Sequence, residues 1–112
     1  MSVRLSVESD TLQDGRITIP VAPQLGFTGD WLVVASKLEL EWVPLFETGI
    51  SISTENVGFI IDELEKMRDF LSANSLIGIM PSVSQHIITT IERMIPILMV
   101  FYEDSDATGW VG

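Results

Sequence analysis

The side chains that most often carry out chemistry in proteins are sparse in this sequence. His86 is the only histidine, and there is no cysteine. The composition therefore excludes disulfide bonds, thiol catalysis and metal sites built on cysteine, and a lone histidine lacks the partners of a transition-metal cluster. As a general base, His86 would need an orienting partner, and the sequence indicates none. We interpret it as a histidine at the start of a helix that is either on the surface or satisfied by hydrogen bonds.

The segment Asp104-Ser105-Asp106-Ala107-Thr108-Gly109 has the composition of the first half of a calcium-binding loop. Its oxygen-bearing side chains alternate, and glycine takes the sixth position. The bidentate carboxylate that such loops carry at the twelfth position would lie beyond Gly112. We therefore interpret the segment as an acidic turn that uses the local hydrogen bonding of aspartate. We predict no bound metal and no cofactor.

Pairs of carboxylates are the other candidates for chemistry. On a strand, Glu39 and Glu41 would lie about 7 Å apart on one face, a separation that glycosidases can use. Such pairs are common in an acidic chain, so the spacing is not specific, and a small domain has little room for a sugar cleft. The sequence also lacks a Gly-x-Ser-x-Gly elbow and a glycine-rich phosphate loop. We expect that the protein is not an enzyme.

Charge and apolar content together describe the surface. The 112 residues carry a net charge of −10, yet 46% of them are hydrophobic. This combination predicts a folded domain with an acidic surface, because a disordered chain has few apolar groups. Such a surface repels nucleic acid and anionic membranes and attracts basic proteins. We expect a single domain over residues 1–112, located in the cytoplasm, without a signal peptide or a membrane span.

The elements that must position these side chains are strands in the first half. Alternating apolar residues predict strands over 3–7 and 17–21, joined into a hairpin at Asp14-Gly15, and a short strand over 50–52. Residues 22–29 contain Pro23, Gly26 and Gly29 and are predicted to form a loop. Residues 31–43 also alternate, and we predict the longest strand there, ended by Pro44.

The second half has helical periodicity. An apolar stripe predicts a helix that closes near Asn74, with these inward residues: Val57, Ile60, Ile61, Leu64, Met67 and Leu71. After a loop at 78–81, a second helix is predicted over 82–94. Pro96 leaves two continuations open, because proline inside a helix costs about 3 kcal/mol. We favour a buried strand over 97–102, and a kinked continuous helix is the alternative. Residues 103–112 are predicted to form a turn-rich tail.

These elements predict an α+β fold, with a mostly antiparallel sheet of four to five strands packed by two helices. Trp31 would share one face of the long strand with Glu39 and Glu41, and an aromatic anchor beside acids suits protein binding when no other element covers it. If another element does cover it, Trp31 belongs to the core. The outer face of the first helix would present a second acidic group: Asp62, Glu63, Glu65 and Asp69.

The block Gly29-Asp30-Trp31-Leu32-Val33-Val34, followed by Pro44-Leu45-Phe46, a strand and the helix with Glu63-Leu64, resembles small immunity proteins of bacterial polymorphic-toxin systems. In some of those families, an Asp-Trp-Leu-x-Val strand precedes a short strand and an amphipathic helix. The resemblance covers about Gly29 to Leu71. It implies a protein without catalysis of its own that masks the active site of a toxin, and it carries over no individual functional residue.

Taken together, the residues predict an acidic, non-catalytic binding protein of the immunity or inhibitor type, which neutralises a basic protein partner such as a toxin. The residues predicted to bind this partner are Trp31, Glu39, Glu41, Asp62, Glu63, Glu65 and Asp69. The alternative is a homo-oligomeric structural or assembly subunit, such as a homodimer, since the apolar runs 77–80 and 97–101 could exceed what one small core buries. A small enzyme that uses carboxylates is the third hypothesis.

Overall fold

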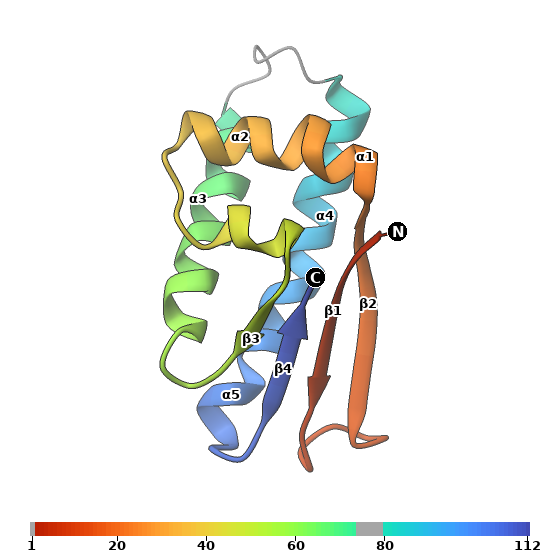
Figure 1. Cartoon of the computed structure of the whole chain (residues 1–112), viewed down its shortest axis with the longest axis vertical. Helices are drawn as coiled ribbons and strands as arrows, with labels where there is room; N and C mark the ends of the chain where they lie inside the picture. Colours follow the sequence, from red (N-terminus) through yellow and green to blue (C-terminus); the bar gives the residue numbers. More distant parts are fainter. Residues whose placement is uncertain (1, 74–79) are drawn as a thin grey trace.

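An antiparallel sheet of four strands lies beside a pair of long helices (Figure 1). The computed structural model describes residues 2–73 and 80–112. The strands are β1 (Ser2–Glu8), β2 (Arg16–Pro23), β3 (Ile50–Ile52) and β4 (Thr108–Val111). Their order in the sheet is β2-β1-β4-β3, and every neighbouring pair is antiparallel. The α+β fold class predicted from the sequence is confirmed.

The predicted hairpin of β1 and β2 is present, with Val7 opposite Ile17. Gly15 in its turn has a φ of 77°, a conformation that glycine adopts without steric cost. The register shifts near the other end, where Val3 faces Ala22 but Arg4 faces Pro20. Val21 is thus an extra residue, a β-bulge, and as a result Val21 and Ala22 are both buried although they are consecutive.

The predicted short strand is β3, but the tail is not merely turn-rich. Residues Thr108–Val111 form β4, which lies between β1 and β3 and pairs with both. Beyond it, Gly112 and Arg4 exchange two backbone hydrogen bonds of 2.9 and 3.0 Å. The segment is short, and Val111 is its one fully buried side chain, so it carried almost no alternating pattern from which a strand could be predicted.

The helix pair consists of α3 (Val57–Ala73) and α4 (Pro81–Leu98), followed by the short α5 (Val100–Glu103). The apolar stripe predicted for the first helix is the buried face of α3. The strand predicted over 97–102 is wrong, because α4 continues through Pro96. Pro96 lies in the last turn, and the Met99 N–H still bonds the Ile95 carbonyl at 2.9 Å. The predicted helix end at Asn74 and the loop start at Gly78 lie outside the described residues.

The long strand predicted over 31–43 is also wrong, because the chain from Gln24 to Lys37 is helical. It comprises α1 (Gln24–Gly26), the π-helix η1 (Phe27–Trp31) and α2 (Leu32–Lys37). Its buried residues have helical spacing: Phe27, Trp31, Val34 and Ala35. The helix ends at Lys37, and it is closed by Glu39, whose φ of 56° is in the left-handed region, and by the Leu40 N–H, which donates to the Ala35 carbonyl at 2.9 Å. Pro44 lies in the first turn of the 3₁₀ helix η2 (Val43–Glu47) and does not end a strand.

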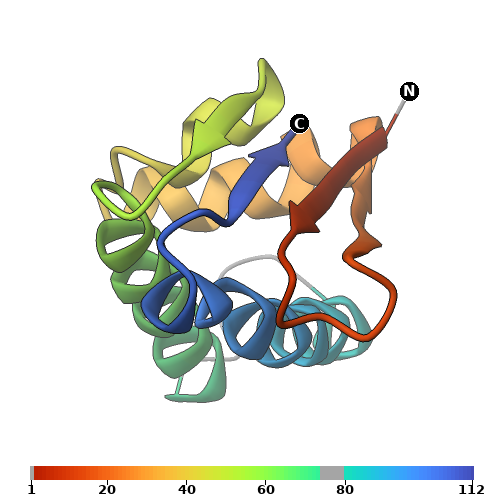
Figure 2. The same ribbon diagram turned by 90° about the horizontal axis from the view of Figure 1, so that it is seen from below.

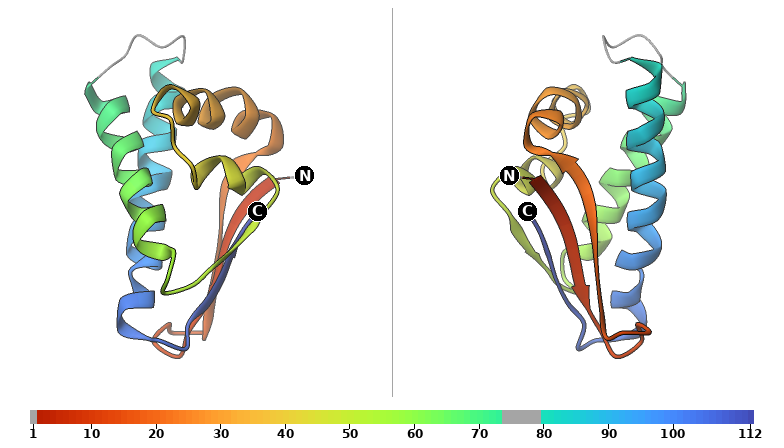
Figure 3. Two further views of the ribbon diagram at one scale, coloured as in Figure 1. Left: turned by 60° about the vertical axis from the view of Figure 1, so that its left-hand side comes forward. Right: turned by 90° about the vertical axis from the view of Figure 1, so that its right-hand side faces the viewer.

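The two layers form a wedge. The sheet and the α3–α4 pair lie close together at the end with the β1–β2 turn and diverge toward the other end, where α1, η1 and α2 lie across the opening (Figure 3). Aromatic side chains fill this wide end: the rings of Phe27 and Trp31 stack with centroids 5.9 Å apart, and Phe46 lies 6.3 Å from Phe27. The segment mistaken for a strand therefore closes the core.

Candidate functional site

The residues predicted to bind a partner fall into three different environments. Trp31 is 1% exposed and stacks on Phe27 in the core of the wide end. Its place in a partner-binding surface was predicted from an exposed strand face, and that face does not exist. The alternative interpretation, in which another element covers Trp31, describes its position correctly.

Glu63 is not on the outer face of its helix. It is 8% exposed, and its carboxylate accepts hydrogen bonds from three successive backbone N–H groups, those of Glu41, Trp42 and Val43, at 2.9 to 3.1 Å. Three converging amides at the start of η2 form a small anion-binding nest. Glu63 supplies the anion from α3, so it links the two elements and is not available to a partner.

The remaining predicted acids are at the surface. Glu39 and Glu41 are exposed in the turn that follows α2, where they do not share a strand face. On α3, each exposed acid has a basic neighbour: Asp62 pairs with Lys66 at 3.1 Å, and Arg68 lies 4.0 Å from Glu65 and 3.3 Å from Asp69. These pairs cancel most of the charge that the α3 face would otherwise present.

A denser group of acids lies at the narrow end of the wedge. The β1–β2 turn and the connection from α5 to β4 meet there (Figures 1 and 2). Together they contribute six of the sixteen acidic residues, and the two segments contain one basic residue, Arg16. We call this group the acidic end; its members are Glu8, Asp10, Asp14, Glu103, Asp104 and Asp106. A shallow pocket of about 320 Å³ lies among four of these carboxylates and Ser9.

One side chain holds the two segments of the acidic end together. The buried Ser9 hydroxyl donates to Asp104 Oδ2 at 2.6 Å, and Asp104 Oδ1 accepts the Asp106 N–H at 2.9 Å. These bonds favour the charged carboxylate, so they lower the pKa of Asp104, with the Ser9 hydroxyl as the largest cause. The first part of the predicted acidic turn, residues 104–107, is therefore a turn, whereas Thr108 and Gly109 belong to β4.

Exposed aromatic side chains adjoin the acidic end. Tyr102 is 62% exposed and immediately precedes Glu103. Its hydroxyl lies close to Gly58, and the next residue, Phe59, is 60% exposed. The ring of Phe59 stacks on Trp42, with centroids 5.9 Å apart and planes inclined by 8°. Acid and aromatic surface therefore occur side by side, a composition that suits a protein interface.

The structure offers little support for metal or membrane sites. Within residues 2–73 and 80–112, no three histidine or acidic side chains converge in a way that could hold a metal ion. Among the helices of the same residues, none has the length and apolarity needed to cross a lipid bilayer.

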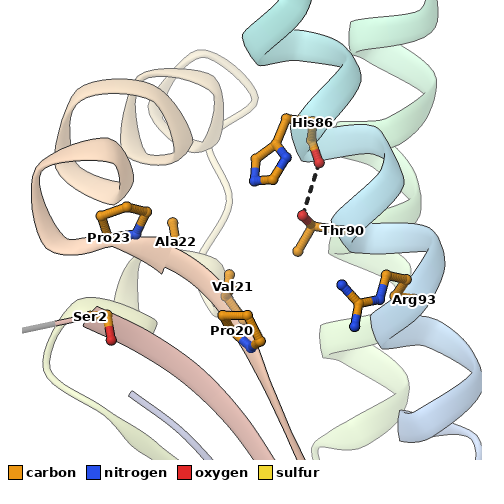
Figure 4. A pocket seen from close by; sticks show the side chains of 8 residues that line it. All are labelled: Ser2, Pro20, Val21, Ala22, Pro23, His86, Thr90 and Arg93. Carbon is orange, nitrogen blue, oxygen red and sulfur yellow. Dashed lines mark hydrogen bonds between the residues drawn. The ribbon is translucent and has the colours of Figure 1, made fainter.

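His86 lies where α4 passes the edge strand β2. It is exposed, the first of the two predicted alternatives, and it lines a pocket of about 250 Å³ with Thr90 and Arg93 of the same helix (Figure 4). The opposite wall is the bulged end of β2, from Pro20 to Pro23. The Thr90 hydroxyl is not free to donate a hydrogen bond into the pocket, since it already donates to the His86 carbonyl at 2.9 Å.

The acidic end was not predicted as a unit. Its residues come from positions near both ends of the sequence, and Ser9 and Asp104 are 95 positions apart. Only the pairing of β4 with β1 brings them together, and β4 had no clear signal. No family model matches the sequence, and the comparisons with curated proteins and with solved structures also gave no match. The resemblance to immunity proteins stays a prediction.

Proposed function

We propose that this protein is a non-catalytic binding protein whose acidic end docks a basic surface on a protein partner. The observation that carries this proposal is the concentration of charge: six acids and one arginine share one end of a molecule whose net charge is −10. On α3, in contrast, the surface acids form ion pairs with Lys66 and Arg68. The acidic end is thus a surface on which acids gather with little compensating positive charge, and it should attract a cation.

Charge of this kind acts mainly on the rate and specificity of association. Fields from clustered carboxylates raise the encounter rate with a positively charged partner by about 10- to 1000-fold, and the gain falls as salt increases. Five of the six carboxylates have no ion-pair or side-chain hydrogen-bond partner among the described residues. Their binding capacity is therefore free, whereas Asp104 is bound to Ser9.

Affinity needs apolar contacts as well, and Tyr102 and Phe59 supply them. Aromatic residues that become buried at the centre of an interface often dominate its binding energy. Both rings are more than half exposed, and Tyr102 is joined directly to the acidic end through Glu103. We propose that these rings anchor the partner after the acids have attracted it.

The specific form of this proposal is an immunity or inhibitor protein that covers the basic active-site region of a toxin. It follows from the resemblance of residues 29–71 and from the charge. Because Asp30–Val34 is helical, the strand on which that resemblance rests has no counterpart here. The charge distribution is therefore the stronger support for an inhibitor of a basic protein.

Capture from a lysate at low salt, with elution by a salt step, tests the proposal. The informative variant neutralises three free carboxylates of the acidic end: Asp10→Asn, Glu103→Gln and Asp106→Asn. We expect wild-type protein to capture a basic protein that this variant does not retain. The matched control makes the same change in net charge on α3, with Asp62→Asn, Glu65→Gln and Asp69→Asn, and should retain the partner. Equal capture by all three proteins would contradict the proposal.

Self-association is the alternative that the exposed aromatic residues keep open. The apolar run 97–101 does not support it strongly, since Leu98 and Phe101 are buried in the core. Mass measured by light scattering over a wide concentration range separates the two functions. A monomer at high concentration favours the basic partner, and a stable dimer favours the assembly subunit.

A further inference from the structure

The groove between β2 and α4 has a character opposite to that of the acidic end. Two pockets, of about 250 and 320 Å³, adjoin there and share Ala22, Pro23 and His86. One extends to Arg93 and the other to Trp31 and Ile87. Together they offer a basic end and an apolar end within a space suited to a small molecule.

Arg93 is the informative residue, because it is the arginine that lines this groove. Within residues 2–73 and 80–112 no carboxylate lies within ion-pair distance of Arg93, as is also true of Arg4, Arg16 and Lys37, so its guanidinium is available to a ligand. The helix offers it no acid either: the residues three and four positions away are Thr89, Thr90, Pro96 and Ile97. Its guanidinium instead points toward β2, beside the pocket (Figure 4).

His86 adds a second potential cation to the same face. It precedes Arg93 by seven residues, which is two helical turns, and both side chains point to the β2 side of α4 (Figure 4). Guanidinium and imidazolium groups both donate charge-assisted hydrogen bonds to carboxylate or phosphate. β2 itself carries no acid, and the acid that lines the groove is Asp30 of η1, at the far end of the second pocket, so the end with Arg93 is the one that favours an anion.

The wall opposite Arg93 and His86 is apolar and is a poor site for the addition of a peptide strand. The bulge turns Val21 and Ala22 inward together, and Pro20 and Pro23 flank them. Proline removes backbone donors, so this stretch of the edge strand is a poor template for strand addition. A compact ligand therefore fits better than an extended peptide.

We propose that this groove binds a small organic anion, a carboxylate or phosphate monoester, with its charged group on Arg93 and His86 and its apolar body along Val21, Ala22 and Pro23. The site is independent of the acidic end and of the partner docked there. A ligand bound there would contact both layers of the wedge, because one wall of the pocket is the edge strand β2 and the other is α4.

Nuclear magnetic resonance can test this directly, because the single histidine gives one imidazole signal set. We choose phenyl phosphate as the probe, with inorganic phosphate as a charged control and benzyl alcohol as an uncharged aromatic control. Phenyl phosphate should shift the His86 imidazole and the Ala22 methyl signals to saturation. Inorganic phosphate should bind more weakly, and benzyl alcohol should leave the Arg93 side-chain signal unchanged. Benzoate in place of phenyl phosphate distinguishes a carboxylate site from a phosphate site.

The variant Arg93→Gln should weaken the binding of phenyl phosphate about tenfold or more, since a charge-assisted bond is lost. Arg16→Gln is the matched control, with the same change in charge at the far end of β2, and should bind as wild type does. Unsaturated or absent shifts would overturn the proposal. So would equal weakening by Arg93→Gln and Arg16→Gln, or benzyl alcohol binding as tightly as phenyl phosphate.

Discussion

The two ends of the wedge use the same kinds of side chain in opposite ways. Trp31 is buried at the wide end, and the carboxylate of Glu63 is buried between α3 and the start of η2; both join elements of the fold. At the narrow end, Tyr102 and the carboxylates of Glu103 and Asp106 face the solvent. An aromatic ring or an acid in this sequence is therefore structural or available for binding according to its location. Substitutions at the two ends should separate stability from association.

The largest effect on stability should come from the aromatic cluster at the wide end. Trp31→Ala removes a ring stacked on Phe27 and leaves a cavity, so the free energy of unfolding should fall by about 4 kcal/mol. The control is Tyr102→Ala at the narrow end, which should cost less than about 1 kcal/mol. Urea unfolding followed by circular dichroism measures both. Similar losses for the two variants would remove the contrast between the ends.

Glu63 should come next. Glu63→Gln replaces a carboxylate that accepts three backbone N–H groups with an amide that has one acceptor oxygen, and we expect a loss of about 3 kcal/mol. Its neighbour on α3 provides the comparison: Glu65→Gln breaks only the surface pair with Arg68 and should change stability by less than about 1 kcal/mol. If the two variants unfold at the same urea concentration, the nest around Glu63 contributes little.

Substitutions at the acidic end should not lower stability, unlike those of Trp31 and Glu63. Neutralising Asp10, Glu103 and Asp106 together relieves repulsion between like charges, so the melting temperature should stay the same or rise slightly, by an amount worth less than about 1 kcal/mol. The increase should disappear at high ionic strength, because salt screens exposed charges. Scanning calorimetry at two salt concentrations measures this. A clear loss of stability would mean that these carboxylates are structural.

The smallest effect concerns the hydrogen bond between Ser9 and Asp104. The folded-state pKa of Asp104 lies below its ordinary value of 3.8, so the stabilisation is complete above that value and is lost as pH falls through the folded-state pKa. Ser9→Ala should raise the pKa of Asp104 toward the ordinary value. A titration of the Asp104 carboxyl carbon by nuclear magnetic resonance measures the change, and Ser6→Ala on the open face of the sheet should leave it unaltered. An unshifted midpoint in Ser9→Ala would exclude the hydroxyl as the main cause.

Some of the fold could be predicted because its signals are local. The β1–β2 hairpin follows from alternation and a glycine at the turn, and α3 follows from an apolar stripe that is fully buried. The segment 31–43 could not be assigned in this way. Its first residues, Trp31 to Ala35, are all apolar, so they fit a strand and a helix equally well. The tertiary structure distinguishes the two. The segment lies across the wide end, and as a helix it buries Trp31, Val34 and Ala35 in the core.

The candidate site was less predictable than the fold. Glu63 has the same sequence context as the exposed acids around it, and only the fold of residues 41–43 shows that it is buried. The acidic end depends on β4, a strand without a pattern, which brings Asp104 next to Ser9. Net charge predicted an acidic binding surface, but its location is a tertiary property.

The most direct test of the acidic end measures how fast the captured partner associates as ionic strength is varied. At low salt, the acidic-end variant (Asp10→Asn, Glu103→Gln and Asp106→Asn) should associate about tenfold more slowly than wild type. The α3 control variant should stay within about threefold of wild type, and all rates should converge at high salt. Equal rates for the two variants at low salt would contradict the account, because association would then depend on net charge and not on the acidic end.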